Sequence, residues 1–225
     1  DDLEVNLSTR PEKSVGSDDI WATAEGALVE ALAAKGWPYR VDPGGGAFYG
    51  PKIDVKVRDA LGRKWQCSTI QLDFNLPERF GMEYVDEANA RRRPIMIHRA
   101  IFGSLERFFG ILVEHWAGAF PLWLAPVQVR LLCVAEAFRP YADEVAAELR
   151  GRGLRVRVEA GERIAKLVRG AERAKTPVMA VIGEREVADR ALAVRTYAGG
   201  DVGSYGVGDL GDRLMGAVVG RGEVE

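Results

Sequence analysis

The first half of the chain changes between the apolar spacing of helices and that of strands. Apolar residues recur at every third and fourth position from 20 to 32, which is the spacing of one helical face. Ser17 before this stretch and Gly36 after it are typical of a helix start and a helix end. Residues 53–58 alternate between apolar and charged side chains, and the turn after them leads into 64–72, which predicts an antiparallel hairpin.

A short strand and a longer helix are predicted further along the chain. The apolar stretch 94–98 is typical of a strand, and the apolar positions from Leu105 to Trp116 predict a helix with a large apolar face. Residues 76–93 are polar and irregular. Two prolines between 121 and 126 mark the best position for a linker.

After this linker, predicted strands and helices alternate. Strands are predicted over 127–133, 155–158, 178–183 and 191–196, and helices over 140–150, 163–175 and 209–219. Such alternation is typical of parallel strands joined by crossover helices. We therefore expect two domains, an antiparallel α+β domain over 1–124 and an α/β domain over 125–225.

The composition narrows the class of protein. Of 225 residues, 47% are hydrophobic and 28% are charged, which favours a packed globular core over disorder. No apolar run approaches the roughly 18 residues that span a bilayer, so we expect no membrane segment. Cys67 and Cys133 lack metal-ligand spacing, which favours reduced thiols in the cytosol. The acidic start at Asp1, without an initiator Met, predicts that the chain is part of a longer protein.

One segment is strongly basic although the whole chain has a formal net charge of −2. Residues 150–175 contain nine Lys and Arg residues against three Glu residues. This pattern is equally compatible with a confined contact to a polyanion and with a solvated Arg-rich surface.

Two strand segments carry side chains that could bind a substrate. Tyr49 and Lys52 place a hydroxyl and a cation at the start of one strand, although Gly-Pro turns before strands are common for purely structural reasons. Cys67, Thr69 and Gln71 are spaced two apart and therefore share a strand face, which favours either a solvent face or a polar ligand pocket.

Three further positions have less obvious roles. Gln66 points away from that shared face unless a β-bulge intervenes. His98 lies at a strand end, where a structural hydrogen bond is more common than a metal ion. Arg107 lies in the first turn of a helix, where the helix dipole disfavours a cation, and this favours an anionic ligand nearby.

The order and spacing of these segments resemble the threonyl-tRNA synthetase family. The matching segments are 7–13, 46–53, 65–67, 71–74, 97–100, 103–107 and 123–129. The resemblance implies part of an antiparallel α+β class II catalytic core, followed by an α/β anticodon-binding domain with a mixed five-stranded sheet. It also implies activation of L-threonine with ATP and Mg²⁺, transfer to threonine tRNA, and a homodimer in the intact cytoplasmic enzyme.

The resemblance assigns roles to residues of the first domain. The implied catalytic residues are Lys52, Gln66 and Arg107, of which Gln66 and Arg107 bind ATP. The implied threonine-binding residues are Tyr49, Lys52, Cys67, Thr69, Gln71 and Ser104.

A zinc ion and the tRNA are the other implied ligands. His98 matches one of three zinc ligands, and the other two match positions upstream of Asp1. Zinc that binds the amino and hydroxyl groups of threonine rejects valine, which lacks the hydroxyl. The implied tRNA-binding residues are Arg169, Lys175, Glu186 and Arg195, while Gly161 stands where the family has a base-reading Asn.

Two alternatives to a threonine–tRNA ligase follow from the same residues. One is another class II synthetase of the prolyl or glycyl type, against which His98 argues. The other is a truncated paralogue that binds tRNA without charging it. The two missing zinc ligands and the upstream arginine that holds the α-phosphate predict that this segment alone is inactive.

Overall fold

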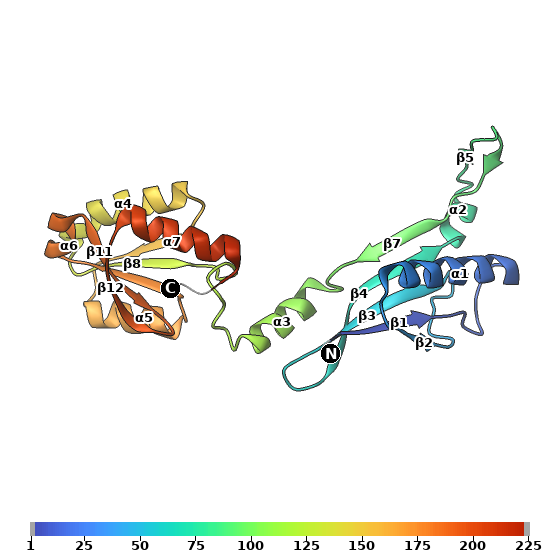
Figure 1. Ribbon diagram of the computed structural model, residues 1–225, viewed down its shortest axis with the longest axis horizontal. Helices are drawn as coiled ribbons and strands as arrows, with labels where there is room; N and C mark the ends of the chain where they lie inside the picture. The colour runs from blue at the N-terminus through green and yellow to red at the C-terminus, as the bar shows by residue number, and fades with distance from the viewer. Residues whose placement is uncertain (1–2, 223–225) are drawn as a thin grey trace. The chain divides into compact units, whose positions relative to one another are not determined.

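The computed structural model describes residues 3–222, and its contacts divide the chain into two compact units (Figure 1). Unit 1 is Asp1–His115 and unit 2 is Trp116–Glu225. The boundary predicted between 124 and 125 lies inside unit 2, because the Arg155 guanidinium donates to the carbonyl oxygens of Trp123 and Ala125. No helix within the described residues is long and apolar enough to cross a membrane.

Unit 1 is built on a five-stranded sheet. In spatial order its strands are β2 (Arg40–Asp42), β1 (Leu3–Ser8), β3 (Lys52–Arg58), β4 (Lys64–Asp73) and β7 (Met96–Ala100). The predicted hairpin 53–72 forms as β3 and β4. Neighbouring strands are antiparallel except β1 and β2, which run parallel, so the sheet is mixed.

Helix α1 (Asp18–Lys35) covers one face of this sheet and creates the core of unit 1 (Figure 1). Its predicted ends are confirmed, because the Ser17 side chain accepts a hydrogen bond from the Ile20 N–H and Gly36 adopts a left-handed conformation with φ of 64°. Trp21 of α1 is 2% exposed and packs with Leu7 of β1 and other apolar strand residues. Burial of this single face provides the hydrophobic stabilisation of the sheet.

The opposite face of the sheet is polar, and we call it the polar face. Residues directly opposite on neighbouring strands point to the same side, so the register defines its rows. From β1 across the sheet the rows are Ser8–Lys52–Gln71–His98, then Asn6–Asp54–Thr69–Ala100, then Glu4–Lys56–Gln66, and finally Arg58–Lys64. Because strand residues alternate between faces, the apolar residues between these rows meet α1.

The stretch predicted to be irregular contains three short elements. They are α2 (Asn75–Arg79), β5 (Tyr84–Val85) and β6 (Arg91–Arg92), of which the two strands form a hairpin. Helix α3 (Leu105–His115) confirms the helix predicted after Ser104. Its apolar side chains are not buried within the described residues, which differs from a helix packed into a core.

The turn between β3 and β4 is held by the buried carboxylate of Asp59. Burial of Asp59 disfavours its charged form, but hydrogen bonds from the Trp65 indole, the Arg63 guanidinium and two backbone N–H groups outweigh this effect. Together they lower the pKa of Asp59 from 3.8 to about 2. Arg63 also pairs with Glu114 of α3 at 2.6 Å, so the turn is tied to that helix.

Unit 2 is an α/β fold with a mixed five-stranded sheet, as predicted. In spatial order its strands are β12 (Gly200–Gly206), β11 (Ala191–Thr196), β10 (Val178–Ile182), β8 (Val129–Cys133) and β9 (Val156–Glu159). The strands β9, β8 and β10 are parallel, whereas β11 and β12 are antiparallel to their neighbours.

Helices cover both faces of this second sheet (Figure 1). Helices α4 (Arg139–Gly151) and α7 (Val207–Gly220) pack on one face, and α5 (Ile164–Arg173) packs on the other. A short 3₁₀ helix, η1 (Glu136–Phe138), precedes α4, and α6 (Glu184–Asp189) follows β10. The helices predicted over 140–150, 163–175 and 209–219 correspond to α4, α5 and α7.

We predict that Asp59 contributes stability that depends on pH. A carboxyl group with a lowered pKa in the folded state stabilises the fold above its unfolded pKa, and this contribution disappears as the pH falls through the folded pKa. The stability advantage of the natural chain over Asp59→Asn is therefore expected to be constant above pH 4 and to shrink between pH 4 and about 2. Urea unfolding of both chains across this range measures it, and a constant advantage would contradict the assignment.

Candidate functional site

A β-bulge in β4 brings Gln66 onto the polar face. Val55 of β3 pairs with Ser68, but the next residue, Lys56, pairs with Gln66, so Cys67 is an extra residue in β4. An extra residue reverses the side to which the preceding residues of the strand point. Gln66 therefore faces the same side as Thr69, which the alternation of the sequence predicted only if a bulge was present.

The carboxylate of Asp54 is the centre of this face. Asp54 is 3% exposed and accepts hydrogen bonds from the Lys52 ammonium, from Gln66 Nε2 at 2.6 Å and from Ser8 Oγ at 3.4 Å. These donors come from β3, β4 and β1. Asp54 thus fixes Lys52 and Gln66, two of the predicted catalytic residues, relative to each other.

Tyr49, Gln71 and His98 form a second group on the same face. The Tyr49 hydroxyl donates to Gln71 Oε1 at 3.0 Å, and the Tyr49 ring meets the His98 ring edge to face at 6.2 Å. Gln71 lies directly opposite His98 in the register of β4 and β7. Tyr49 reaches this position because Gly50 approaches the Leu72 carbonyl so closely that no Cβ could fit between them.

The buried Asp73 carboxylate fixes the position of the His98 ring by a hydrogen bond. His98 Nε2 lies 2.8 Å from Asp73 Oδ2, and the same carboxylate accepts from the backbone N–H groups of Asn75 and Leu76 at 2.9 and 3.0 Å. Asp73 is 2% exposed. Within residues 3–222, no three His, Cys, Asp or Glu side chains are arranged to hold a metal ion, so His98 is a single candidate ligand.

The Arg107 side chain contacts β4 at the bulge. Its guanidinium donates to the Gln66 carbonyl oxygen at 3.1 Å and lies 5.9 Å from the centre of the Trp65 ring. The Ser104 hydroxyl accepts from the Arg107 backbone N–H at 3.1 Å, which makes Ser104 a cap at the start of α3. Burial raises the pKa of the Cys67 thiol, and the Arg107 charge partly opposes this change.

The predicted residues of the first domain fall into two groups, of which the smaller is Cys67 at the bulge with Ser104 and Arg107 at the start of α3. The residues that the structure brings onto the polar face are Tyr49, Lys52, Gln66, Thr69, Gln71 and His98. The buried Thr69 hydroxyl has no hydrogen-bond partner among the described residues, so it can accept or donate to a ligand. Sequence analysis missed Asp54 and Asp73, because an acid that alternates with apolar strand residues is typical of a solvent-facing position.

The predicted tRNA-binding residues of unit 2 lie on different elements: Arg169 is on α5, Lys175 follows α5, Glu186 is on α6 and Arg195 is on β11. Arg195 of β11 pairs with Asp201 at 3.1 Å and is near Glu172 of α5, and its Nε has no partner within the described residues. Glu186 accepts from the Gly183 backbone N–H at 2.9 Å at the start of α6. Lys175 donates to the Ala117 carbonyl oxygen.

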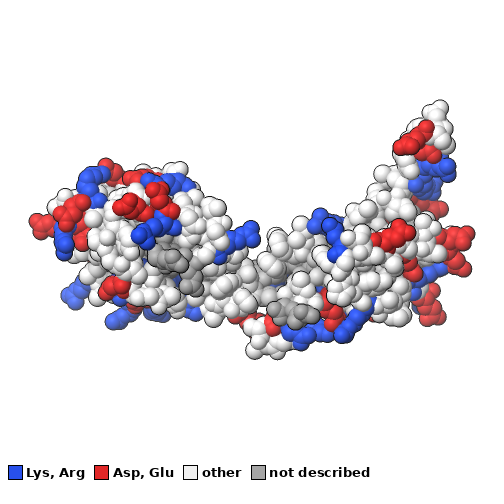
Figure 2. Space-filling view, in the orientation of Figure 1, with Lys and Arg blue, Asp and Glu red and all other residues white. Residues whose placement is uncertain are grey.

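Much of the basic segment 150–175 is bonded within unit 2. Six of its nine cations contact acids or carbonyl oxygens of this unit, namely Arg150, Arg152, Arg155, Arg157, Lys166 and Lys175. In the described part of the chain, Arg163, Arg169 and Arg173 make no such contact. Figure 2 shows acidic and basic side chains interspersed over the visible face of this unit. Of the six bonded cations, only Arg152, Arg157 and Lys166 pair with acids within residues 3–222, so the other three keep an uncompensated charge and Arg163, Arg169 and Arg173 are the cations left without a contact.

Comparison with known families divides the chain at the same place. Residues 4–116 match the class II core domain of tRNA synthetases for glycine, histidine, proline, serine and threonine. Residues 128–215 match an anticodon-binding domain.

The names of individual relatives specify which amino acid those proteins attach to tRNA. The chain is 60% identical over 215 residues to a chloroplastic/mitochondrial threonine–tRNA ligase of Arabidopsis thaliana, and 57% identical over 208 residues to a threonine–tRNA ligase of Synechococcus. These matches cover 96% and 92% of this chain but only 33% and 34% of the relatives, so the chain spans about a third of their length.

A solved structure has the same fold. The RNA-binding domain of threonyl-tRNA synthetase from Cryptosporidium parvum superimposes with a TM-score of 0.82 at 38% identity. The match covers 95% of this chain and 54% of that one.

We predict that Lys52 and Asp54 are strongly coupled. Their side chains are 15% and 4% exposed, so Asp54→Ala leaves a poorly hydrated ammonium without its carboxylate. This change is expected to lower the free energy of unfolding by about 3–5 kcal/mol. In a Lys52→Met background it costs clearly less, because no uncompensated charge remains. Urea unfolding of the four chains measures both costs, and equal costs would rule out the coupling.

Proposed function

The chain belongs to the class II tRNA synthetases, and from this premise we propose that it is the C-terminal part of a cytosolic threonine–tRNA ligase. The proposed enzyme joins L-threonine to ATP, releases pyrophosphate and transfers threonine to the terminal adenosine of threonine tRNA, acting as a homodimer. The observation that carries the proposal is the convergence of Tyr49, Gln71 and His98 on one polar face within a matched synthetase core. The named relatives are threonine–tRNA ligases, so nothing favours a prolyl or glycyl enzyme.

Threonine needs partners for an ammonium, a carboxylate and a hydroxyl. In our proposal Tyr49, Gln71 and the unpartnered Thr69 hydroxyl bind its polar groups, while Lys52 supplies positive charge near its carboxylate. We assign Cys67 at the bulge and Ser104 at the start of α3 to the border of the same threonine site. The network around Asp54 fixes Lys52 before substrate arrives, which lowers the entropic cost of binding.

ATP needs groups that bind phosphates and an aromatic ring. We assign this role to Arg107 and Gln66, which lie side by side through the bond from the Arg107 guanidinium to the Gln66 carbonyl. A guanidinium can pair with phosphate oxygens and can stack on an aromatic ring. Mg²⁺ accompanies the ATP phosphates.

The residues of this chain fit one position of a zinc site. Histidines that bind zinc commonly give their other ring N–H to a carboxylate, and Asp73 stands in this relation to His98. Hydrogen bonding of Nε2 to Asp73 leaves the Nδ1 lone pair for the metal. A bound zinc ion supplies a Lewis acid that attracts the amino and hydroxyl groups of threonine, and the remaining ligands come from the longer protein.

Unit 2 supplies the contact with tRNA in this proposal. Its match to an anticodon-binding domain supports the role. Arg169 is exposed and supplies charge to phosphates, as does Lys175 beside the carbonyl of Ala117, while Arg195 and Glu186 offer groups that can read bases.

We predict that His98→Ala abolishes stoichiometric zinc in the full-length protein that contains this chain. Threonine-dependent exchange of pyrophosphate into ATP is expected to disappear with it, because threonine loses the ion that selects it over valine. Metal analysis and the exchange assay measure the two effects. His98→Ala protein that retained zinc and still preferred threonine would refute the assignment, and natural protein without any threonine-dependent exchange would refute the ligase itself.

We further predict that Arg169 and Arg195 contribute differently to tRNA binding. Arg169→Ala is expected to weaken all tRNAs alike and to reduce the salt dependence by about one unit of slope or less. Arg195→Ala is expected to lose about 1–3 kcal/mol of discrimination against a changed anticodon. Competition binding with anticodon variants of threonine tRNA tests both. Equal weakening of every tRNA by Arg195→Ala would leave this residue with a charge effect only.

A further inference from the structure

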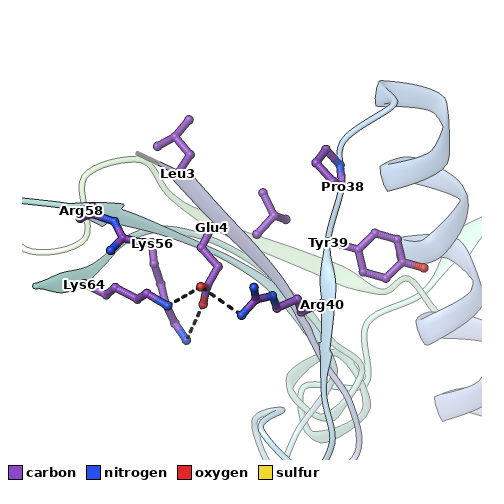
Figure 3. A pocket seen from close by; sticks show the side chains of 9 residues that line it. Leu3, Glu4, Pro38, Tyr39, Arg40, Lys56, Arg58 and Lys64 are labelled. Carbon is purple, nitrogen blue, oxygen red and sulfur yellow. Dashed lines mark hydrogen bonds and ion pairs between the residues drawn. The ribbon is translucent and has the colours of Figure 1, made fainter. Parts of the chain in front are cut away.

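Four cations gather around one carboxylate at the far end of the polar face. We call Arg40, Lys56, Arg58 and Lys64 the basic cluster; they line a cavity of about 300 Å³ beside Glu4 of β1 (Figure 3). Figure 2 shows basic side chains gathered around the start of β1. Among the described residues that line this cavity, the four cations exceed the single acid, Glu4, by three charges.

Glu4 binds only one of these cations closely. Its carboxylate is 2.6 Å from Lys64, but 3.8 Å from Arg40 and 3.9 Å from Lys56, as the three dashed lines of Figure 3 show. Within the described residues, Arg58 has no acidic partner. The hydrogen bond from Lys64, with the charges of Arg40 and Lys56, holds the pKa of Glu4 below its ordinary value despite partial burial, so Glu4 stays charged at neutral pH.

The register of the strands makes this arrangement unfavourable by itself. Arg58 of β3 lies directly opposite Lys64 of β4, and Lys56 is on the same face of β3. Like charges directly opposite each other destabilise a sheet. The strand ends therefore carry an electrostatic cost that binding of an anion would remove.

Other arginines of unit 1 do not share acids in this way. In the β5–β6 hairpin, Arg91 pairs with Glu83 at 3.0 Å and Arg92 pairs with Asp86 at 2.8 Å. In this hairpin each arginine pairs with its own acid, and such exposed pairs contribute little to stability. Cations therefore outnumber the nearby acids in the basic cluster, whereas Arg91 and Arg92 of the hairpin each have an acidic partner of their own.

We propose that the basic cluster binds backbone phosphates of an RNA strand whose end reaches the candidate site on the same face. This inference rests on the proposed tRNA ligase function, which requires an RNA end near Lys52 and Gln71. Lys56 lies four residues along β3 from Lys52, about 13 Å at the rise of a strand. An RNA strand that ends at the candidate site can therefore place a phosphate a few nucleotides from its end over the cluster.

The test uses the 225-residue chain and an RNA hairpin that carries the amino-acid-accepting end of threonine tRNA but no anticodon loop. We expect the chain with Lys56→Gln and Lys64→Gln to bind the hairpin severalfold more weakly at low salt. The slope of log affinity against log salt becomes less steep by about 1.4, since two phosphate contacts are lost on a single strand. The Gln side chains keep the length of the stems while they remove the like charges, so the hairpin β3–β4 should still fold.

The matched control is Arg91→Gln with Arg92→Gln, which removes the same charge from the same unit. We expect this control to leave the slope unchanged, and an equal change in both variants would overturn the proposal, because net charge alone would explain it. A lysine variant that lost ATP binding while it bound the hairpin normally would assign the cluster to nucleotide phosphates and overturn it as well.

Whole threonine tRNA separates this inference from the proposed function. If the natural chain binds tRNA but not the hairpin, the basic cluster is not an RNA site, while the ligase proposal stands. If the natural chain binds neither RNA, the role of unit 2 fails and the inference fails with it.

Discussion

The arrangement of the polar face of unit 1 depends on the buried carboxylate of Asp54, which requires hydrogen-bond donors. An acid as buried as Asp54 is costly unless its oxygens are bonded, and its donors come from Lys52, Gln66 and Ser8 on three different strands. Gln66 reaches Asp54 only because Cys67 is an extra residue in β4. The requirement that stabilises the polar face therefore also fixes the positions of a cation and an amide in the candidate site.

Backbone acceptors also require donors in unit 2, and some cations of the basic segment serve as these donors. Carbonyl oxygens at the start of unit 2 need donors, and Arg155 and Lys175 supply them. Glu186 is engaged by the backbone at the start of α6. Arg169 is exposed and has no ion pair in the described part of the chain, so its charge is available to a polyanion. Arg152, Arg157 and Lys166 pair with acids, so the number of cations in the segment overestimates the positive charge that a ligand meets.

The sequence predicted elements whose side chains follow a simple period, and it failed where backbone bonding decides. The periodic stretches became α1, β3 and β4. Strand β12 was missed because its glycines disfavour a strand, yet its backbone pairs with β11 at the edge of the sheet. The bulge could not be predicted, since no property of Cys67 marks it as the extra residue. The family resemblance supplied the candidate residues, whereas the buried partners Asp54 and Asp73 were visible only in the structure.

The polar face changes its charge along the strands, and this gradient gives it a direction. At the His98 end, Asp54 pairs with the Lys52 ammonium and Asp73 is hydrogen-bonded to His98, so a ligand there meets both donors and acceptors. At the Arg58 end, cations exceed acids and repel one another across the hairpin. A ligand that carries an ammonium group at one end and phosphates along its length matches this gradient in one orientation only, because the reverse orientation places phosphates against the buried carboxylates. An aminoacylated RNA end has this distribution of charge. If the proposed RNA site is correct, unequal pairing of charges on this sheet selects the direction in which the RNA end binds.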